Sequence, residues 1–598
     1  MDDGTLSLII LALTVAVFVW NKLPVEVVAV LTALALWATG VLGFPAVISG
    51  FGDPVVVFIA SLFVVSEGVD STGVTAWAGQ AIVRYAGTTR TRLLLAVCGL
   101  CAVLTALITL NGSVAALLPL VVMLAVRIGE PPSRMLMPLT FAGSAGSLLM
   151  LTGTPVNIIV SEAASKAGAG EFAFFSFAVV GVPLVIGTIA IAVLAGPRLL
   201  PAARPVNPPA DLALHAETLG LHYSRSEAFY RLRIRELSPL LGQEARELDL
   251  TPYPDLVVVG VQDTQGRYHV DAALGVGDVL VVNGPPEQVR SLTADAGLAV
   301  SRVPGRVEDL MTRDTGVIEV VVPPRSSLVG ETVFPGMHRG PDLVIVAVQR
   351  MGKDRGKRPT RLAEGDALLV HGVWPALEEL TKDRDVLLVD SPELIRRQAV
   401  PWGPKASLAV AILAAMVVLL ATGAVPPAMA GLLAATATVL TGVVRPQRAY
   451  RAISWQIIVL IGALIPLSTA IQTSGGADRI ADLIVEAVGP GRPYLLLLAL
   501  FLLTAALGQV VSNTATVLIV APIAVAAAQG TGTSVQPVLM LVAVAGAASL
   551  LTPIATPANM MIMNPAGYRF GDYWKLGLPV LLWWLLTALV VIPLVWRF

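Results

Sequence analysis

Long apolar runs separated by short polar interruptions fill both ends of the chain. Each run is about as long as a helix that crosses a bilayer, roughly 20 residues. In the first part of the chain, such runs predict membrane helices over 6–21, 24–43, 54–72, 135–163 and 176–198. In the second part, they predict helices over 406–424, 427–444, 455–474, 534–565 and 576–596. The pattern predicts a polytopic α-helical membrane protein.

Two further apolar segments are divided into shorter arms by a polar tip. Residues 93–127 form two arms that meet at Asn111-Gly112-Ser113, and residues 493–528 form two arms around Ser512-Asn513-Thr514. The arms are shorter than most of the spans above and meet at a polar tip, so each pair predicts a re-entrant hairpin that enters the membrane and returns. The arginine-bearing segment before the first hairpin is too polar to span and is expected to lie along the membrane surface.

The two halves match each other at one spacing. Asn111 and Asn513 are 402 residues apart, and Thr154-Pro155-Val156-Asn157 matches Thr556-Pro557-Ala558-Asn559 at the same spacing (556 minus 154). Each half is predicted to hold five membrane helices and one hairpin. Because five is an odd number of crossings, the second copy must have the opposite orientation, which predicts an inverted repeat.

Composition and charge support this interpretation. The chain is 55% hydrophobic and 14% charged, whereas soluble proteins have about 25% charged residues. Most Lys and Arg residues of the membrane halves fall on one side of the predicted topology, which the positive-inside rule assigns to the cytoplasm, with both termini outside. The excess of Arg over Lys favours a bacterial source and therefore the bacterial inner membrane. The net charge of −1 argues against a nucleic-acid partner.

Between the halves, residues 200–400 have the composition of a soluble protein. This segment is itself duplicated, because Gly277-Asp278 and Gly365-Asp366 are 88 residues apart (365 minus 277) and each begins a Gly-Asp-x-Leu-x-Val run. Alternating runs over 257–261 and 344–348 predict strands, and 286–292 and 375–380 predict short helices. The topology places these two small α/β modules in the cytoplasm.

The two modules resemble the C-terminal lobe of RCK domains, also called TrkA-C. The resemblance implies dimerisation, here a homodimer, and in some members binding of a regulatory nucleotide such as cyclic di-AMP. A dimerisation module without a ligand is an equal alternative, and NAD is not expected because no G-x-G-x-x-G precedes either copy. The expected domains are a first transmembrane repeat, a linker with the first RCK C-lobe, a second RCK C-lobe and a second transmembrane repeat, over 1–199, 200–304, 305–400 and 401–598.

The polar interruptions carry the candidate chemistry. In hydrocarbon an unpaired backbone group costs several kcal/mol, so broken helices persist only where they line a cavity enclosed by protein. Matched interruptions in two inverted repeats indicate a binding site near the middle of the membrane. Freed carbonyls with Asn and Ser oxygens suit a small hard cation, and the helix N-terminus that follows suits an anion.

Ser512-Asn513-Thr514 followed by Thr556-Pro557-Ala558-Asn559 resembles the divalent anion/sodium symporter family of the ion transporter superfamily, over both membrane halves. The resemblance implies sodium ions bound by Ser512, Asn513, Ala555 and Asn559 in one half and by Asn111, Gly153 and Asn157 in the other. It implies a small anionic substrate bound by Asn111, Gly112, Ser113, Thr154, Pro155, Asn513, Thr514, Thr556 and Pro557. The first half departs from the family pattern, because Leu110 and Gly112 stand where Ser and Thr are expected. This difference favours an anion smaller than a dicarboxylate, such as sulfate.

The expected function is therefore sodium-coupled uptake of a small divalent anion, sulfate or a dicarboxylate, by alternating access. An enzyme is not expected, because the five histidines all lie in the insert without metal-ligand or triad spacing, and no P-loop is present. The two cysteines, Cys98 and Cys101, lie in an apolar run and are expected to pack. The alternatives are an antiporter of the NhaD or arsenite-permease kind or another exporter of the superfamily, an RCK-gated channel, and a membrane sensor.

Overall fold

The computed structural model describes most of the chain. The described residues are 2–20, 22–75, 77–79, 81, 89–203, 219, 229–244, 248–263, 268–269, 273–300, 310–312, 315–339, 342–356, 358–392, 395, 402–403, 405–476, 479, 482, 486 and 491–598. The chain forms two compact units. One unit holds Met1–Ala210 and Lys405–Phe598, and the other holds Asp211–Pro404.

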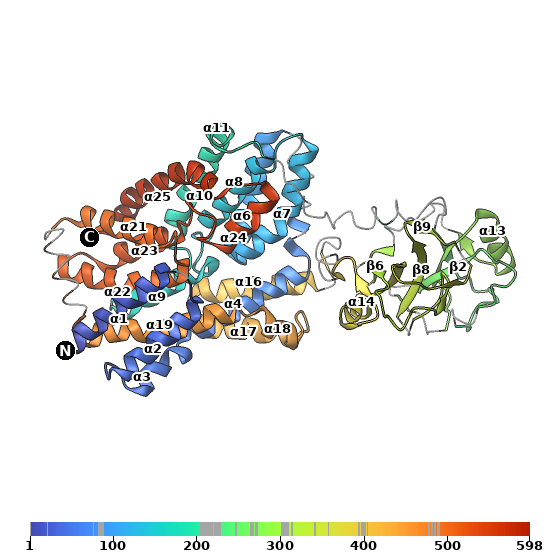
Figure 1. Cartoon of the computed structure of the whole chain (residues 1–598), viewed down its shortest axis with the longest axis horizontal. Coiled ribbons are helices and arrows are strands. Elements are labelled where there is room, and N and C mark those ends of the chain that lie inside the picture. Colours follow the sequence, from blue (N-terminus) through green and yellow to red (C-terminus); the bar gives the residue numbers. More distant parts are fainter. Residues whose placement is uncertain are drawn as a thin grey trace. The chain divides into compact units, whose positions relative to one another are not determined.

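The first unit is helical (Figure 1). Its first half contains α1 (Asp3–Trp20), α2 (Val25–Ala38), α3 (Phe44–Ser49), α4 (Pro54–Ser71), α6 (Arg90–Leu107), α7 (Leu110–Arg127), α8 (Ser133–Gly146), α9 (Pro155–Lys166), α10 (Ala178–Leu194) and α11 (Gly196–Leu199). Its second half contains α16 (Ala406–Thr422), α17 (Pro427–Leu440), α18 (Pro446–Ala452), α19 (Trp455–Thr473), α21 (Pro493–Leu507), α22 (Asn513–Thr531), α23 (Val535–Ala547), α24 (Pro557–Ala566) and α25 (Tyr573–Val595). Six helical stretches among the described residues are long and apolar enough to cross a membrane.

The helices follow the apolar runs, and the structure adds detail that the runs did not predict. The short helices α3 and α18 precede α4 and α19, and each has proline in its first turn. Arg90 and Arg92 belong to α6, so they begin a hairpin arm. The rest of the predicted surface segment lies largely outside the described residues.

The predicted position of the first hairpin tip was wrong by a few residues. The arms α6 and α7 are separated only by Ile108 and Thr109, so Asn111, Gly112 and Ser113 lie in the first turn of α7. The reason is local, because the Thr109 hydroxyl accepts a hydrogen bond from Gly112 N (3.2 Å) and caps the helix there. A threonine one residue before Leu110 therefore starts the helix earlier than the polar run suggests.

Elements of the two halves correspond along the chain. Helices α2 and α17 have 14 residues each and begin 402 residues apart (427 minus 25). Helices α9 and α24 begin at the same spacing (557 minus 155), and each starts with proline after a capping threonine. Packing corresponds too, because α4 packs on α17 while its counterpart α19 packs on α2.

The helices of this unit divide into two groups by their packing. We call α1–α4 with α16–α19 the scaffold group, and α6–α11 with α21–α25 the tip group, because the second contains both hairpins. Extensive packing occurs within each group. Between the groups, the main contacts among described residues are α19 with α22 and α4 with α9.

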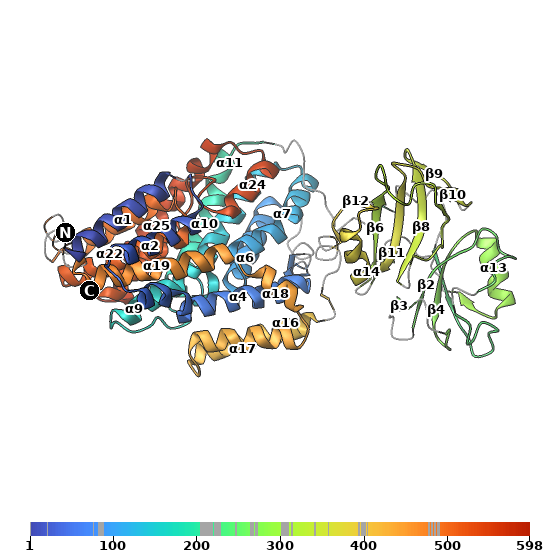
Figure 2. The same cartoon turned by 60° about the horizontal axis from the view of Figure 1, so that its bottom comes forward.

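The second unit contains two antiparallel sheets of five strands each (Figure 2). The first copy holds β1 (Phe229–Arg233), β2 (Val257–Gln262), β3 (Tyr268–His269), β4 (Val279–Asn283), α13 (Pro286–Asp295) and β5 (Ala299–Val300). The second holds β6 (Thr315–Val321), β7 (Thr332–Val333), β8 (Leu343–Arg350), β9 (Lys353–Asp354), β10 (Thr360–Arg361), β11 (Ala367–Val373), α14 (Trp374–Glu379) and β12 (Leu387–Leu388).

The two copies have the same topology. The strand order is β3-β2-β4-β1-β5 in one sheet and β9-β8-β11-β6-β12 in the other, and β7 pairs separately with β10. The Gly-Asp turns also match. Gly277 N donates to Ile234 O (2.9 Å), and Gly365 N donates to Val322 O (2.9 Å). One apolar cluster contains Val257 and Val259 of the first sheet with Val317 and Leu369 of the second, so the sheets pack together.

His371 on β11 is buried, and its ring Nδ1 lies 2.9 Å from the carbonyl oxygen of Gly316. Burial lowers the pKa of His371 from 6.5 to about 4. The unfolded chain therefore binds a proton between these pH values that the folded insert does not. We expect the free energy of unfolding of the insert to fall as the pH drops through this window, by at most about 3 kcal/mol, and to be fully retained above pH 6.5.

The His371→Asn variant tests this expectation, because asparagine stands at the matched position of the first copy, Asn283 (371 minus 88). Hydrogen exchange of the β11 peptide in the full-length protein, corrected for intrinsic rates, should accelerate below pH 6.5 in the natural chain. The variant should lose that dependence. Equal pH dependence in both proteins would show that other groups are responsible.

Candidate functional site

Two linkers outside the α-helices interrupt the tip group at matched positions, and the first contains a short 3-10 helix, Leu151–Gly153. The first lies between α8 and α9 and the second between α23 and α24. Asn157 Nδ2 donates to Ser147 O (2.9 Å) and Met150 O (2.8 Å). Asn559 Nδ2 donates to Ser549 O (2.9 Å) and Thr552 O (3.0 Å). One amide in each half therefore satisfies two carbonyls that the broken helix has freed.

A glycine packs against each linker. A Cβ at Gly181 of α10 would overlap the carbonyl oxygen of Leu148, and a Cβ at Gly577 of α25 would overlap that of Leu550. Leu148 and Leu550 are themselves 402 residues apart (550 minus 148). Backbone therefore packs directly on backbone at both linkers, and any side chain at these glycines would displace a carbonyl.

Threonine caps set the helix that follows each linker. The Thr154 hydroxyl accepts from Val156 N (3.4 Å), and the Thr556 hydroxyl accepts from Asn559 N (3.2 Å). Pro155 and Pro557 occupy the first helical positions, where the missing N–H costs nothing. Gly153 and Ala555, whose carbonyl oxygens are predicted to bind sodium, are buried and stand directly before these caps.

The second hairpin tip is bound tightly to its linker. The Gln509 amide donates to Ala548 O (3.0 Å) and accepts from Leu551 N (2.9 Å). The Thr552 hydroxyl donates to Gln509 O (2.8 Å). The Ser549 hydroxyl pairs with Asn513 Oδ1 at the start of α22. The structure therefore brings Asn513 next to the linker that Asn559 holds, while Ser512 precedes it as the N-cap residue of α22.

The first hairpin tip is attached differently. Apolar Leu107 stands at the position that matches Gln509 (509 minus 402). Thr152 donates to Ala106 O at 3.4 Å. Asn111 is exposed, whereas Ser113 is fully buried. The departure seen in the sequence is therefore also a structural difference between the two tips.

Buried oxygen atoms without a hydrogen-bond partner gather on these same elements. Among the described residues, such atoms on the tip group include Ser113 Oγ, Ser144 Oγ and Asn157 Oδ1 in the first half, and Ser512 Oγ, Thr516 Oγ1 and Asn559 Oδ1 in the second. Hydroxyl and amide oxygen atoms are the ligands that a hard cation such as sodium prefers. Of the other predicted residues, Thr514 is buried in the first turn of α22, and Gly112 is half-buried.

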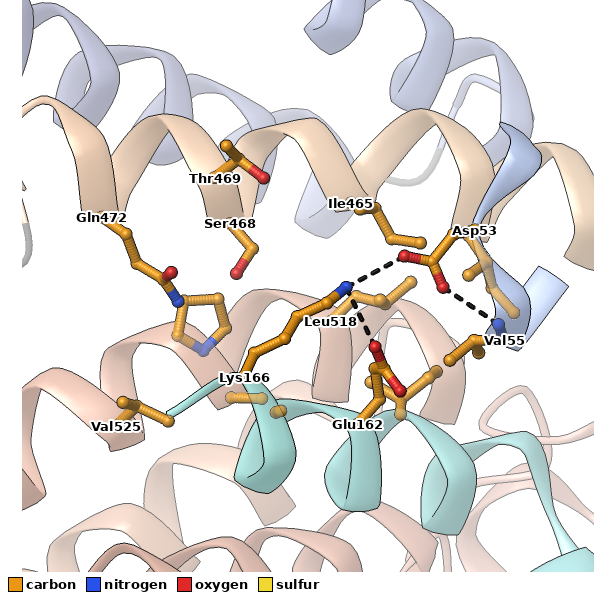
Figure 3. Close-up of a pocket in the computed structure, with 15 residues that line it drawn as sticks. Asp53, Val55, Glu162, Lys166, Ile465, Ser468, Thr469, Gln472, Leu518 and Val525 are labelled. Atoms are coloured by element: carbon orange, nitrogen blue, oxygen red, sulfur yellow. Dashed lines mark hydrogen bonds and ion pairs between the residues drawn. The ribbon is translucent and has the colours of Figure 1, made fainter. Parts of the chain in front are cut away.

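A cavity of about 70 Å³ that sequence reasoning missed lies between the two helix groups. Figure 3 shows Lys166 of α9 between the carboxylates of Asp53 and Glu162, opposite Ser468 and Gln472 of α19. Lys166 and Asp53 are 113 residues apart in the sequence. No local motif could have joined them.

Comparisons with known proteins agree with this architecture. The family model described as "Citrate transporter" (CitMHS) matches residues 15–545 and 471–598. A relative from Escherichia coli K12, the uncharacterized transporter YfbS, is 31% identical, with 98% of each chain covered. An uncharacterized transporter of Synechocystis is 29% identical over 96% of this chain and 94% of its own. Sodium/sulfate cotransporter 1 of Chlamydomonas reinhardtii is 24% identical over 63% of this chain and 44% of its own.

The matched family model extends over nearly all of both membrane halves, and the relatives are transporters. The helical unit, with six stretches among the described residues that are long and apolar enough to cross a membrane, agrees with this family. The chain therefore belongs to the CitMHS citrate transporter family and is a membrane transport protein, not an enzyme.

Proposed function

We propose that this chain is a secondary active transporter that takes up a small divalent anion together with sodium by alternating access. The observation that carries the proposal is the matched pair Asn157 and Asn559. Each uses its amide nitrogen to hold a broken helix and leaves its amide oxygen buried without a partner. Two enclosed oxygen-rich sites at corresponding positions are suited to bind cations.

The substrate would bind between the two tips. The N-termini of α9 and α24 direct positive dipole ends toward the linkers, and a positive dipole end favours an anion. We assign substrate contacts to Thr154, Thr556, Asn513 and Thr514, with the first tip contributing less than the second. The incomplete first tip and the similarity to sodium/sulfate cotransporters of Chlamydomonas favour sulfate as the substrate. The family description keeps citrate and other carboxylates as candidates.

The membrane orientation and the insert complete the proposal. The matched element order supports an inverted repeat with both termini outside and the insert in the cytoplasm of a bacterial cell. The duplicated sheets support two RCK C-lobe-like modules. We propose that these dimerise the transporter and regulate it, with a nucleotide such as cyclic di-AMP as the ligand to test.

Uptake into proteoliposomes tests the transport proposal. Radiolabelled sulfate, succinate and citrate are offered with an inward sodium gradient, with a matched potassium gradient, and with no gradient. We expect accumulation of one of these anions only with sodium. Accumulation that is equal in all three conditions would contradict sodium coupling.

A further inference from the structure

Among the described residues, the main contacts between the two helix groups lie at one face. Helix α19 packs on α22 and α4 packs on α9, and residues of all four helices or their caps line the cavity of Figure 3. The counterparts of these pairs are α4 with α7 and α19 with α24, and neither makes comparable packing among the described residues. The structure is therefore closed at the cavity face and looser at the corresponding opposite face.

An ion pair crosses between the groups at the closed face. Lys166 Nζ, at the end of α9 in the tip group, lies 2.9 Å from Asp53 Oδ2. Asp53 is the N-cap residue of α4 in the scaffold group, and its other oxygen accepts from Val55 N (2.9 Å). The Asp53 side chain is only 11% exposed, so it is fixed in place and largely shielded from solvent.

A second ion pair at the same lysine stays within one helix. Lys166 Nζ lies 3.4 Å from Glu162 Oε1, one turn earlier on α9. This contact moves with the tip group and does not join the groups. Glu162 therefore provides a matched control for Asp53, with the same charge and the same partner.

The opposite face has no such ion pair at the corresponding positions. Trp455 matches Asp53 and Tyr568 matches Lys166, each 402 residues later. Tyr568 donates its hydroxyl to Ser133 O, inside the tip group. The charged pair is therefore a feature of one face of the protein.

We infer that the Lys166–Asp53 ion pair is a latch that holds the cavity face closed and must open once in each transport cycle. The inference rests on the proposed alternating access for its role in transport, but the latch itself is a property of this closed structure. Lys166 and Asp53 are positioning residues, because the contact sets the relation between two helix groups. They are not assigned contacts to the substrate.

Cysteine labelling measures the opening directly. Both natural cysteines, Cys98 and Cys101, are buried, so a cysteine placed in the cavity by Ser468→Cys should dominate reaction with a maleimide. In this background, Asp53→Asn keeps a capping side chain for α4 but removes the charge. We expect Asp53→Asn and Lys166→Met to raise the labelling rate about three- to tenfold, as the loss of a partly shielded ion pair allows. Lys166→Arg keeps the positive charge and should be labelled as slowly as the Ser468→Cys parent.

The control and the salt response separate a latch from general loosening. Glu162→Gln should leave the labelling rate within about twofold of the Ser468→Cys parent. High salt should accelerate labelling of the parent but not of Asp53→Asn, because salt screens only an existing ion pair. Unchanged labelling in both Asp53→Asn and Lys166→Met, or equal acceleration by Glu162→Gln, would overturn the inference.

This experiment needs no substrate, so its failure is distinct from failure of the proposed function. Labelling that responds as expected, in a protein that accumulates none of the three anions, would keep the latch and reject the transport proposal. Sodium-coupled uptake in a protein whose labelling rate does not change in Asp53→Asn would support the transport proposal and reject the latch.

Discussion

Replacing Asn559 by leucine is expected to abolish uptake and to lower the stability of the helical unit by about 2–6 kcal/mol. The Asn559 amide donates to two buried carbonyls of the second linker, and each carbonyl left unsatisfied costs about 1–3 kcal/mol. The same change removes the buried amide oxygen that we assign to sodium. Thermal unfolding of the purified protein and sodium-driven uptake in proteoliposomes measure the two effects.

Asn157→Leu is the matched variant in the first half. Its amide makes the same two contacts with the first linker, so the loss of stability should be similar. Comparison of sodium dependence in the two variants, at temperatures where both remain folded, then reports on each half separately. Normal uptake and normal stability in Asn559→Leu would contradict both the structural and the binding role.

Asn513→Ala is expected to abolish uptake while leaving the protein folded. The Asn513 side chain is half-buried at the first residue of α22, and its oxygen pairs with the Ser549 hydroxyl. Loss of one such bond costs about 1 kcal/mol, which the fold should tolerate. Sodium-driven uptake falls because the residue is assigned to both the sodium ion and the anion.

Asn111→Ala serves as the control at the matching position of the first tip. Asn111 is exposed, so its removal should leave the thermal midpoint unchanged and should reduce uptake less than Asn513→Ala. Size-exclusion profiles and thermal midpoints establish folding for both variants. Normal uptake in a folded Asn513→Ala protein would remove this residue from the site.

The membrane helices could be predicted from the sequence because a bilayer leaves few alternatives for long apolar runs. Asn157 and Asn559 were also identified, but only as ligands. The structure shows that their nitrogens are occupied by linker carbonyls, which leaves only their oxygens for an ion. A pattern of residue types indicates where polar groups lie and does not indicate which atom of an amide is already used.

The helix start at Leu110 depends on a local cap, the hydroxyl of Thr109, which the polar run after it obscured. Two other features could not be predicted because they depend on contacts distant in the sequence. The attachment of the second tip depends on Gln509, which meets a linker about 40 residues away. The pair of Lys166 with Asp53 depends on how two helix groups meet. The duplicated insert was predicted from its matched Gly-Asp turns, but its sheet order required the structure.

The division into two helix groups also determines where the backbone crosses from one to the other. It does so between α4 and α6, between α19 and α21, and between α11 and α16. The third connection, residues 200–405, contains the entire second unit, Asp211–Pro404. Along the chain, the second unit therefore lies between the last helix of the tip group in the first half and the first helix of the scaffold group in the second half.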